Sequence, residues 1–596
     1  MRTSTAVLLA VVLFSSAAWA QNDPAIEAHI KHVQDALLPP VLVKGEPPKT
    51  TKLSDRMAEL HVPGVSIAVI HGGKLEWARG FGVVAEGGAP VTPDTLFQAA
   101  SISKPISALA ALRLAEAGKL DLDADVNSYL KSWKVPASKF TDDKKVTVRE
   151  LLSHTAGMTV HGFPGYAGDA PLPTLRQMLD GEPPANTPAI RVDMPPASEW
   201  RYSGGGYLVL RQLLQDLTGK PFQDLMQETV LKPMGMSHSS YEQPLPPDKL
   251  AKAAMPYHED GSPFPGGPLL YTELAPDGLW TTPTDLARYV IETQQSLAGR
   301  SNLVLSQEMT RQMLTEVSRN WGLGPSLGGS AEHRFFGHGG SNQGYKCEFD
   351  AYNDGDGVVI MTNGDAGYDL VIDIRRTIAR DYGWPDFQPA THELGKISAV
   401  DFKRVAGTYR LDNGWSVTVS REGDRYFAQA IDEGREEILP ENDHLFFSKE
   451  AERQFLFQAG GLTIHTPGSP DLPMKRLDAG AAKRIDQRLA ARNKRVGTQT
   501  RSPDSEDALR RLLQEILQGK PDYARMDKGS AETIRDNLDV LHKDRAAFGD
   551  IASITFEKVA PNGTDVYDVR FAHGRWRMWI EVGTDKKILN LDIRLL

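Results

Sequence analysis

The sequence of 596 residues is nearly devoid of cysteine, and Cys347 is its only one. A disulfide within the chain is therefore excluded, as is a lipid-modified cysteine near the N-terminus. We expect the folded parts to be stabilised by their hydrophobic cores alone. Long internal repeats and extended low-complexity tracts are also absent, and the hydrophobic content of 40% is ordinary for a globular protein, so most of the chain should fold.

Basic residues are not in excess, since 67 lysines and arginines face 77 aspartates and glutamates. This balance offers no positive footprint for a phosphate backbone, so a nucleic acid is not expected as a partner. The sequence also lacks a His-Glu-x-x-His motif, and the run His258-Glu259-Asp260 has no second cluster of ligands at a useful spacing. We therefore expect no metal site and no organic cofactor.

The apolar run near the N-terminus is short. Residues Ala6 to Phe14 fall well below the roughly 20 residues that a membrane-spanning helix needs. Arg2 precedes this run and the small-residue exit Ala18-Trp19-Ala20 follows it, which is typical of a secretory signal peptide at residues 1–20, cut before Gln21. The alternative is an uncleaved anchor. We expect a periplasmic or secreted protein without a stable membrane anchor, and the sequence does not define its oligomeric state.

A chain of this length is too long for one hydrophobic core, so two to four domains are expected. Residues 25–388 mix strand-like and helix-like runs. Short alternating runs at 400–480 predict a small all-β barrel or sandwich. After a polar stretch at 481–503, residues 503–596 predict a small α+β domain, with an amphipathic helix from Leu509 followed by three strands. The predicted fold class is α+β.

Two Ser-x-x-Lys pairs occur, Ser101 with Lys104 and Ser128 with Lys131. A serine and a lysine three residues apart on a helix share one face, so the lysine can hold or remove the serine proton. A long apolar run follows Ser101, and the amides at the start of such a helix favour negative charge on the serine oxygen. Ser128 lies beside acidic residues without such a run. Context favours Ser101, although pairs at this spacing also arise by chance.

Two glycine-rich segments suggest the walls of a site. Tyr202 stands before the run 203–206 and an apolar helix, where its phenol can act as a general base if a nearby cation stabilises the phenolate; a core tyrosine is the alternative. The run from His338 to Ser341 is typical of a strand edge that a ligand approaches closely. There the amide of Ser341 can join that of Ser101 in binding an oxyanion. A satisfied surface histidine is the alternative for His338.

Five motifs in order resemble those of class C β-lactamase-related serine hydrolases, over residues 25–388. That family includes class C β-lactamases, D-alanyl-D-alanine carboxypeptidases, D-aminopeptidases and β-lactamase-like esterases. The motifs are Phe97-Gln98-Ala99-Ala100-Ser101-Ile102-Ser103-Lys104, Leu151-Leu152-Ser153-His154-Thr155-Ala156-Gly157, Tyr202-Ser203-Gly204, Gly278-Leu279-Trp280-Thr281-Thr282 and His338-Gly339-Gly340.

The resemblance implies a β-lactamase/transpeptidase-like fold, in which an antiparallel sheet is flanked by helices and accompanied by an all-helical lobe. It implies Ser101 as the nucleophile, Lys104 as its base partner and Tyr202 as the general acid/base. It also implies His338 and Gly340 at the strand edge of the substrate site. The barrel at 400–480 is similar to domains appended to D-aminopeptidase-like members, and the last domain to cystatin or nuclear-transport-factor-type modules.

Two positions depart from the β-lactamase pattern. Gly204 stands where those enzymes usually have an asparagine that contacts the substrate, and His338 stands where they usually have a lysine that holds its carboxylate. Both departures are similar to the esterase and D-aminopeptidase branches. We therefore predict a serine hydrolase that acts through an acyl-enzyme on a small-molecule or peptide-like ester or amide. The alternatives are a true β-lactamase or D-alanyl-D-alanine carboxypeptidase, and a catalytically weak penicillin-binding or envelope-binding protein.

Overall fold

The computed structural model of the chain describes residues 23–595 except 413 and 584. The predicted signal peptide at 1–20 lies outside these residues. The chain forms two compact units, one of residues 23–38 and 50–388 and the other of residues 39–49 and 389–595. In the part of the chain that the structure describes, no helix is both long and apolar enough to cross a membrane.

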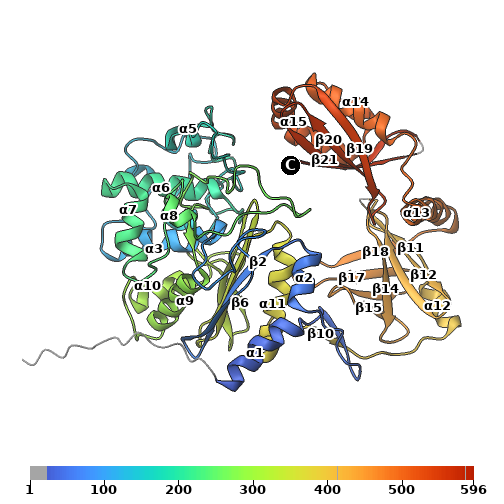
Figure 1. Ribbon diagram of the computed structural model, residues 1–596, viewed down its shortest axis with the longest axis horizontal. Coiled ribbons are helices and arrows are strands. Elements are labelled where there is room, and N and C mark those ends of the chain that lie inside the picture. Colours follow the sequence, from blue (N-terminus) through green and yellow to red (C-terminus); the bar gives the residue numbers. More distant parts are fainter. Residues whose placement is uncertain (1–22, 413, 584, 596) are drawn as a thin grey trace, which may run out of the picture. The chain divides into compact units, whose positions relative to one another are not determined.

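The first unit is built on an antiparallel sheet with strand order β3-β2-β9-β8-β7-β6. Figure 1 shows helices on both of its faces. A separate short ladder pairs β4 with β5 beside the start of α3. The strands are β2 (Gly64–His71), β3 (Lys74–Gly82), β4 (Phe97–Gln98), β5 (Trp280–Thr281), β6 (Ser326–Gly329), β7 (Arg334–Asn342), β8 (Tyr345–Tyr352) and β9 (Gly357–Thr362).

Strand β2 is buried on both faces, which explains its nearly continuous apolar sequence. Successive side chains of a strand point to opposite faces. Val65 and Ile67 accordingly pack with helices α1, α2 and α11 in one core, whereas Ala68 and Ile70 pack with α3, α9 and the helical lobe in another. The sheet therefore separates two hydrophobic cores, and the predicted sheet with flanking helices and a helical lobe is confirmed.

The helices of the first unit fall into these two layers. They are α1 (Pro24–Asp35), α2 (Leu53–Glu59), α3 (Ser103–Glu116), α4 (Val148–Leu152), α5 (Leu175–Asp180), α6 (Gly204–Thr218), α7 (Phe222–Met226), α8 (Pro247–Leu250), α9 (Pro283–Leu297), α10 (Gln307–Met313) and α11 (Gly367–Asp381), with short turns η1 (Ala100–Ile102), η2 (Val126–Ser128) and η3 (Gln227–Leu231).

The second unit contains a closed barrel of strands β11 to β18, which confirms the predicted barrel. Its inward positions alternate along each strand, as Phe455 and Phe457 do on β16, so the interior is a packed core. The strands are β11 (Gly407–Arg410), β12 (Ser416–Glu422), β13 (Arg425–Ala430), β14 (Arg435–Pro440), β15 (Leu445–Ser448), β16 (Gln454–Gln458), β17 (Gly461–His465) and β18 (Leu472–Arg476), preceded by α12 (Ala399–Val405).

The last part of this unit packs two helices on an antiparallel sheet, β19-β20-β21-β22. The predicted amphipathic helix is α14, which buries Leu509, Leu512 and Ile516 on the sheet. The prediction of three strands is wrong, because the sheet has four strands, each paired antiparallel with the next along the chain. The elements are α13 (Ala479–Thr498), α14 (Ser505–Leu517), η4 (Tyr523–Arg525), α15 (Lys528–Ala547), β19 (Ile551–Val559), β20 (Asp565–Phe571), β21 (Arg575–Val582) and β22 (Ile588–Leu595).

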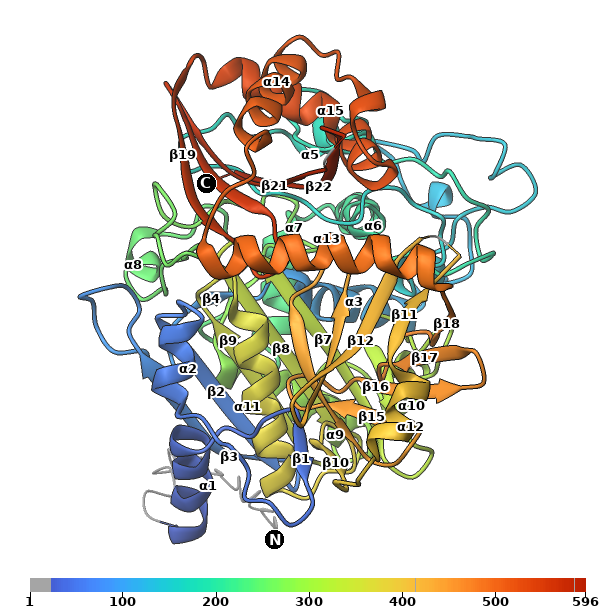
Figure 2. The same ribbon diagram turned by 90° about the vertical axis from the view of Figure 1, so that its right-hand side faces the viewer.

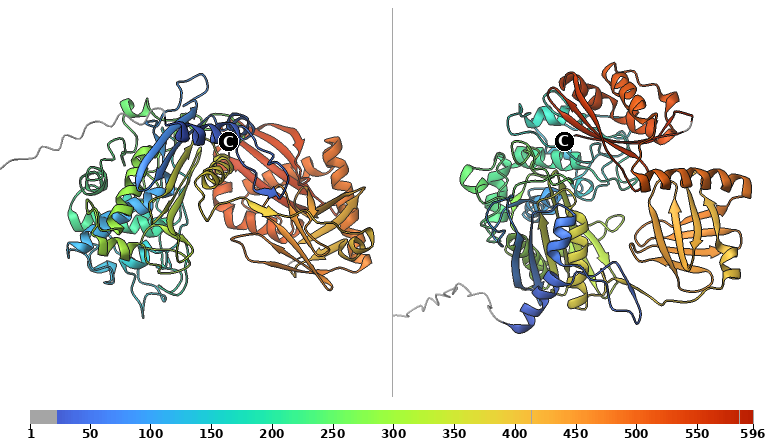
Figure 3. Two further views of the ribbon diagram at one scale, coloured as in Figure 1. Left: turned by 90° about the horizontal axis from the view of Figure 1, so that it is seen from below. Right: turned by 45° about the vertical axis from the view of Figure 1, so that its right-hand side comes forward.

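Two segments differ from the predicted organisation. Residues 39–49, predicted to lie in the first domain, belong to the second unit because β1 (Val41–Val43) pairs in parallel with β10 (Ala390–His392). The polar stretch 481–503 was predicted only as a separator, yet most of it forms the long helix α13. Figures 2 and 3 show α13 as one continuous helix next to the barrel.

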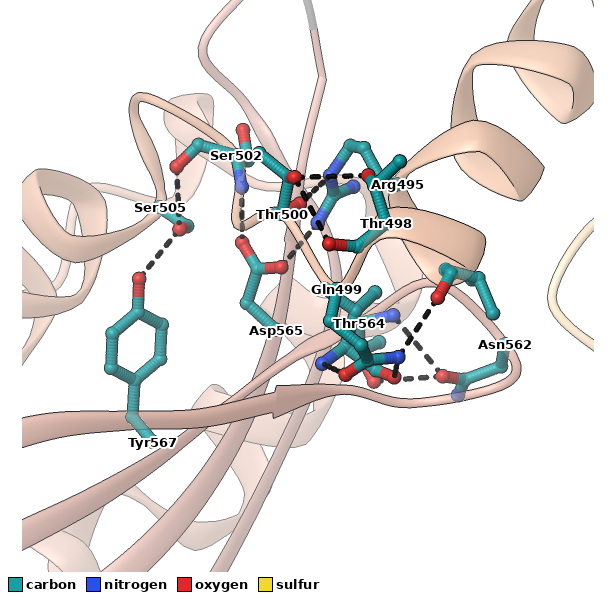
Figure 4. Close-up of polar contacts among 12 residues, drawn as sticks. Arg495, Thr498, Gln499, Thr500, Ser502, Ser505, Asn562, Thr564, Asp565 and Tyr567 are labelled. Atoms are coloured by element: carbon teal, nitrogen blue, oxygen red, sulfur yellow. Dashed lines mark hydrogen bonds and ion pairs between the residues drawn. The ribbon is translucent and has the colours of Figure 1, made fainter.

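Helix α13 joins the barrel to the α+β domain through arginines on one face. Arg492 donates hydrogen bonds to carbonyl oxygens of the barrel, including that of Ala430 at 3.1 Å. Arg495 forms an ion pair with Asp565 of β20, a fully buried residue that also accepts a hydrogen bond from the Ser502 amide at 2.8 Å (Figure 4). The Asp565 carboxylate therefore binds both the last turn of α13, through Arg495, and the segment that follows this helix, through the Ser502 amide.

Loss of Arg495 should weaken the connection between α13 and the α+β domain. Arg495→Ala leaves a buried carboxylate without its cation, which costs on the order of 3 kcal/mol. We expect faster hydrogen exchange in the peptides of β19 and β20, measured by mass spectrometry. Arg510→Ala is the matched control, because its pair with Glu506 is exposed and contributes about 0.5 kcal/mol. Equal exchange in the two variants would contradict the role given to the Asp565 pair.

Candidate active site

Ser101 lies in the turn η1, between β4 and the buried helix α3. The preceding residue, Ala100, has a φ of 47°, a left-handed conformation that a non-glycine residue rarely adopts. Strain of this kind persists only where the surrounding structure enforces it, and it gathers at functional sites. The Ser103 hydroxyl accepts a hydrogen bond from the Leu279 amide at 3.0 Å, which fastens the start of α3 to the segment before β5.

Lys104 is the buried amine of the site, with only 1% of its surface exposed. Its Nζ atom donates to Ser101 Oγ at 2.9 Å and to the Pro276 carbonyl oxygen at 2.9 Å. The same atom lies 4.8 Å from the centroid of the Tyr202 ring. A cation in this place is attracted to the electron-rich face of the phenol ring. The structure thus brings together the three side chains predicted to carry the chemistry.

Tyr202 precedes α6, whose N-cap Ser203 accepts a hydrogen bond from the Gly206 amide at 3.0 Å. Aromatic rings surround the phenol. The ring centroids of His154, Trp321 and His338 lie 4.3, 5.8 and 6.1 Å from that of Tyr202. These rings confine Tyr202 to one position over the Lys104 amine.

The histidines of this cluster are neutral. Burial, and then the nearby Lys104 ammonium, lower the pKa of His154 well below its usual value and that of His338 to about 3. The His338 Nδ1 atom lies 2.6 Å from the Gly339 carbonyl oxygen, so Nδ1 carries the proton and donates. Its Nε2 atom is then an acceptor, and it has no hydrogen-bond partner among the described residues.

The edge of β7 is open where the site lies. Strand β6 pairs with β7 only as far as Gly337, so the β6 side of His338 to Asn342 has no strand partner among the described residues. Gly340 allows this edge to approach η1, because a Cβ atom there would lie 2.3 Å from the Ala99 carbonyl oxygen. Backbone amides of an open edge are donors that can bind an oxyanion.

A cavity of about 900 Å³ joins these parts. Of the predicted site residues, Ser101, Lys104, Tyr202, His338 and Ser341 line it. The complete lining consists of Ser101, Lys104, His161, Gly162, Phe163, Trp200, Arg201, Tyr202, Asp277, Arg319, His338, Gly339, Ser341, Asn342 and Tyr368.

Two predicted residues, Gly204 and Gly340, do not line the cavity. Gly204 is buried beneath the loop that follows α4, where a Cβ atom would come within 2.9 Å of the Phe163 ring. Both glycines therefore act through close packing, and neither presents a surface to a bound molecule. The second Ser-x-x-Lys pair does not form a site, since Ser128 Oγ donates to the Asp125 carbonyl oxygen and Lys131 Nζ to that of Asp216.

Several lining residues were not predicted. Asp277 directly precedes the motif Gly278-Leu279-Trp280-Thr281-Thr282, and Asn342 follows the predicted strand edge by one residue. Both residues adjoin motifs already selected from the sequence, and this position in the sequence is a signal that could have identified them. Tyr368 lies outside every motif, and only the folded chain brings it to the cavity. Trp321 also lies outside every motif; it does not line the cavity but packs its ring against that of His338.

The fold and this cavity define the class of protein, a serine hydrolase related to β-lactamases. The model of the beta-lactamase family matches residues 50–381, and the chain belongs to this family.

Named relatives of several activities are similar to the chain. Penicillin-binding protein 4 of Amycolatopsis lactamdurans is 26% identical over 60% of this chain and 95% of its own length. Esterase EstB of Burkholderia gladioli is 31% identical over 35% of this chain and 53% of the esterase. The structure of an octameric penicillin-binding protein homologue from Pyrococcus abyssi has a TM-score of 0.50 at 22% identity, and the alignment covers 71% of this chain and 98% of that one. This last likeness shows the fold.

Replacing each serine in turn should show which of the two Ser-x-x-Lys pairs is needed for activity. Ser101→Ala should abolish turnover of a nitrophenyl ester and labelling by a fluorophosphonate, because the nucleophilic oxygen is removed. Ser128→Ala should leave both unchanged, since its hydroxyl is bonded to a backbone carbonyl at the surface. Labelling is measured by intact-protein mass spectrometry. Loss of activity in a folded Ser128→Ala protein would contradict the assignment.

Proposed function

We propose that the chain hydrolyses ester or amide bonds of D-amino-acid or peptidoglycan-like substrates through an acyl-enzyme on Ser101. The observation that carries this proposal is the 2.9 Å hydrogen bond between Lys104 Nζ and Ser101 Oγ beside the Tyr202 ring, within one cavity. The named relatives include a penicillin-binding protein and an esterase, and the name of the esterase supports the hydrolysis of an ester bond.

The first step forms the acyl-enzyme. Lys104, the base partner of Ser101, accepts the hydroxyl proton as Oγ bonds to the substrate carbonyl carbon and the carbonyl oxygen takes up the electron pair. The backbone amides of Ser101 and Ser341 are the proposed donors to that oxyanion. When the intermediate collapses, the bond to the leaving group breaks, and the Tyr202 hydroxyl supplies the proton that the leaving group needs.

The second step releases the acid. A water molecule takes the place of the leaving group and gives its proton to the Tyr202 phenolate as its oxygen attacks the acyl carbon. Collapse of this second intermediate breaks the bond to Ser101 Oγ, which regains its proton from Lys104. The site thus returns to its starting state. We also propose that the protein acts in the periplasm or outside the cell, in keeping with the pattern of residues 1–20.

The proton-transfer groups can be tested singly. Lys104→Ala and Tyr202→Phe should each lower kcat for a nitrophenyl ester by a factor of about 10² to 10⁴, the usual contribution of a positioned acid or base. KM should change little in Tyr202→Phe, because the ring that lines the cavity stays in place. Near-normal kcat in Tyr202→Phe would exclude the phenol from proton transfer and leave Lys104 as the base.

The preference between a neutral ester and a substrate with a carboxylate should depend on the charge of the side chain at position 338, on the open edge of β7. A neutral His338 offers an acceptor where a substrate carboxylate needs a donor, so a nitrophenyl ester should have a higher kcat/KM than nitrocefin. Lowering the pH from 7 to 5 should not help nitrocefin through this residue, because a group whose pKa is about 3 stays neutral over that range.

His338→Lys should narrow the gap between the two substrates, since lysine restores a permanent cation. The measurement is kcat/KM for both substrates in both proteins. A wild-type preference for nitrocefin that the substitution does not diminish would favour a true β-lactamase. A burst of nitrophenol without turnover would favour a catalytically weak penicillin-binding protein.

A further inference from the structure

Asp277 is a buried carboxyl group in the wall of the active-site cavity. Its exposed fraction is 5%, and the buried Oδ1 atom of its carboxyl group has no hydrogen-bond partner among the described residues. A buried polar group without a partner costs free energy, so it calls for an explanation. Burial raises the pKa of this carboxyl to about 7, while the charges of Lys104 and Arg211 oppose that rise.

The cations near Asp277 are engaged elsewhere. Lys104 directs its two hydrogen bonds to Ser101 Oγ and to the Pro276 carbonyl oxygen. Arg211 donates to the carbonyl oxygens of Thr272 and Glu273. Burial and the Asp277 charge raise the pKa of the Glu273 carboxyl well above its usual value, which favours its neutral form. Asp277 is therefore the carboxyl group that the cavity wall leaves without a partner.

The backbone fixes Asp277 close to the reacting atoms. The carbonyl of its neighbour, Pro276, shares the Lys104 Nζ atom with the Ser101 hydroxyl. Its own carbonyl oxygen accepts a hydrogen bond of 3.2 Å from the Asn342 side chain, at the end of the open β7 edge. Asp277 and Ser101 line one cavity, so a substrate whose carbonyl carbon lies at Ser101 occupies a space that Asp277 also borders.

We propose that Asp277 is a specificity residue that binds a protonated amine on the acyl group of the substrate. The inference rests on the proposed acyl transfer at Ser101 and narrows its substrates to aminoacyl esters or amides. An ammonium group satisfies the unpartnered carboxyl and favours its ionised form, because opposite charges at close range do so. A neutral acyl group leaves the carboxyl unpaired, and a site with an unpaired buried group rejects that ligand.

The test compares two esters that differ only by the amine, D-alanine methyl ester and methyl propionate. At about pH 7 an α-amino group is still protonated. The measured quantity is the kcat/KM for D-alanine methyl ester divided by that for methyl propionate. Comparing this ratio between proteins removes the difference in intrinsic reactivity between the two esters. Asp277→Asn should lower this ratio by about 10- to 100-fold, as expected for a lost hydrogen bond between charged groups. The kcat/KM for methyl propionate should fall less than that for D-alanine methyl ester, because methyl propionate has no amine for Asp277 to bind.

Asp193→Asn is the matched control, because it removes one negative charge from a half-exposed residue that pairs with the cavity residue Arg201. Its ratio should equal that of the wild type. The thermal midpoint of Asp277→Asn should be equal to or above that of the wild type, since the wild-type carboxyl has no partner to lose.

An equal fall of kcat/KM for both esters in Asp277→Asn would overturn the proposal and assign the residue to the positioning of Lys104. A lower thermal midpoint with an unchanged ratio would assign it to the fold. Absence of turnover with both esters in the wild type, together with no labelling of Ser101, would instead overturn the proposed acyl transfer.

Discussion

The site depends on the burial of one amine, that of Lys104. A nitrogen so deeply buried needs hydrogen-bond acceptors, and the structure provides the Ser101 hydroxyl and the Pro276 carbonyl. To supply both, the chain must begin α3 directly after β4 and bring the loop before β5 over its first turn. The strained conformation of Ala100 is a consequence of this arrangement. The same amine lies over the Tyr202 ring, so it is placed between the predicted nucleophile, Ser101, and the other predicted proton-transfer group, Tyr202.

The charge of Lys104 also determines the character of the cavity. Together with burial, it keeps His154 and His338 neutral, so the aromatic cluster around Tyr202 offers acceptors and ring faces instead of cations. The remaining charge of the wall belongs to Asp277 and to arginines, of which Arg201 is paired with Asp193. A cavity of this kind is unlike a site built to hold a carboxylate with a lysine.

The second unit is stabilised in a different way. Its barrel and its α+β domain each have an apolar core, and the helix between them contributes long polar side chains. Arg488, Arg492 and Arg495 lie four and three residues apart, so they share one face of α13. Their stems cover apolar surface while their guanidinium groups reach carbonyl oxygens and carboxylates. This explains why a helix with few apolar residues is a structural element and not a loose linker.

Local patterns determined much of this protein. The spacing of Ser101 and Lys104, the glycines around Tyr202 and the alternating runs of the barrel express geometry over a few residues, and such geometry can be read from the sequence. The tertiary structure alone decided the rest. Strand β1, in the segment 39–49, pairs with a strand about 350 positions later. The arginines of α13 find their hydrogen-bond and ion-pair partners in segments distant in the sequence. Asp277 lines the cavity only because the folded chain brings α3, α6 and β7 together around it. Contacts between residues far apart in the chain leave no periodic trace in either segment, because each segment alone satisfies its own helix, strand or turn.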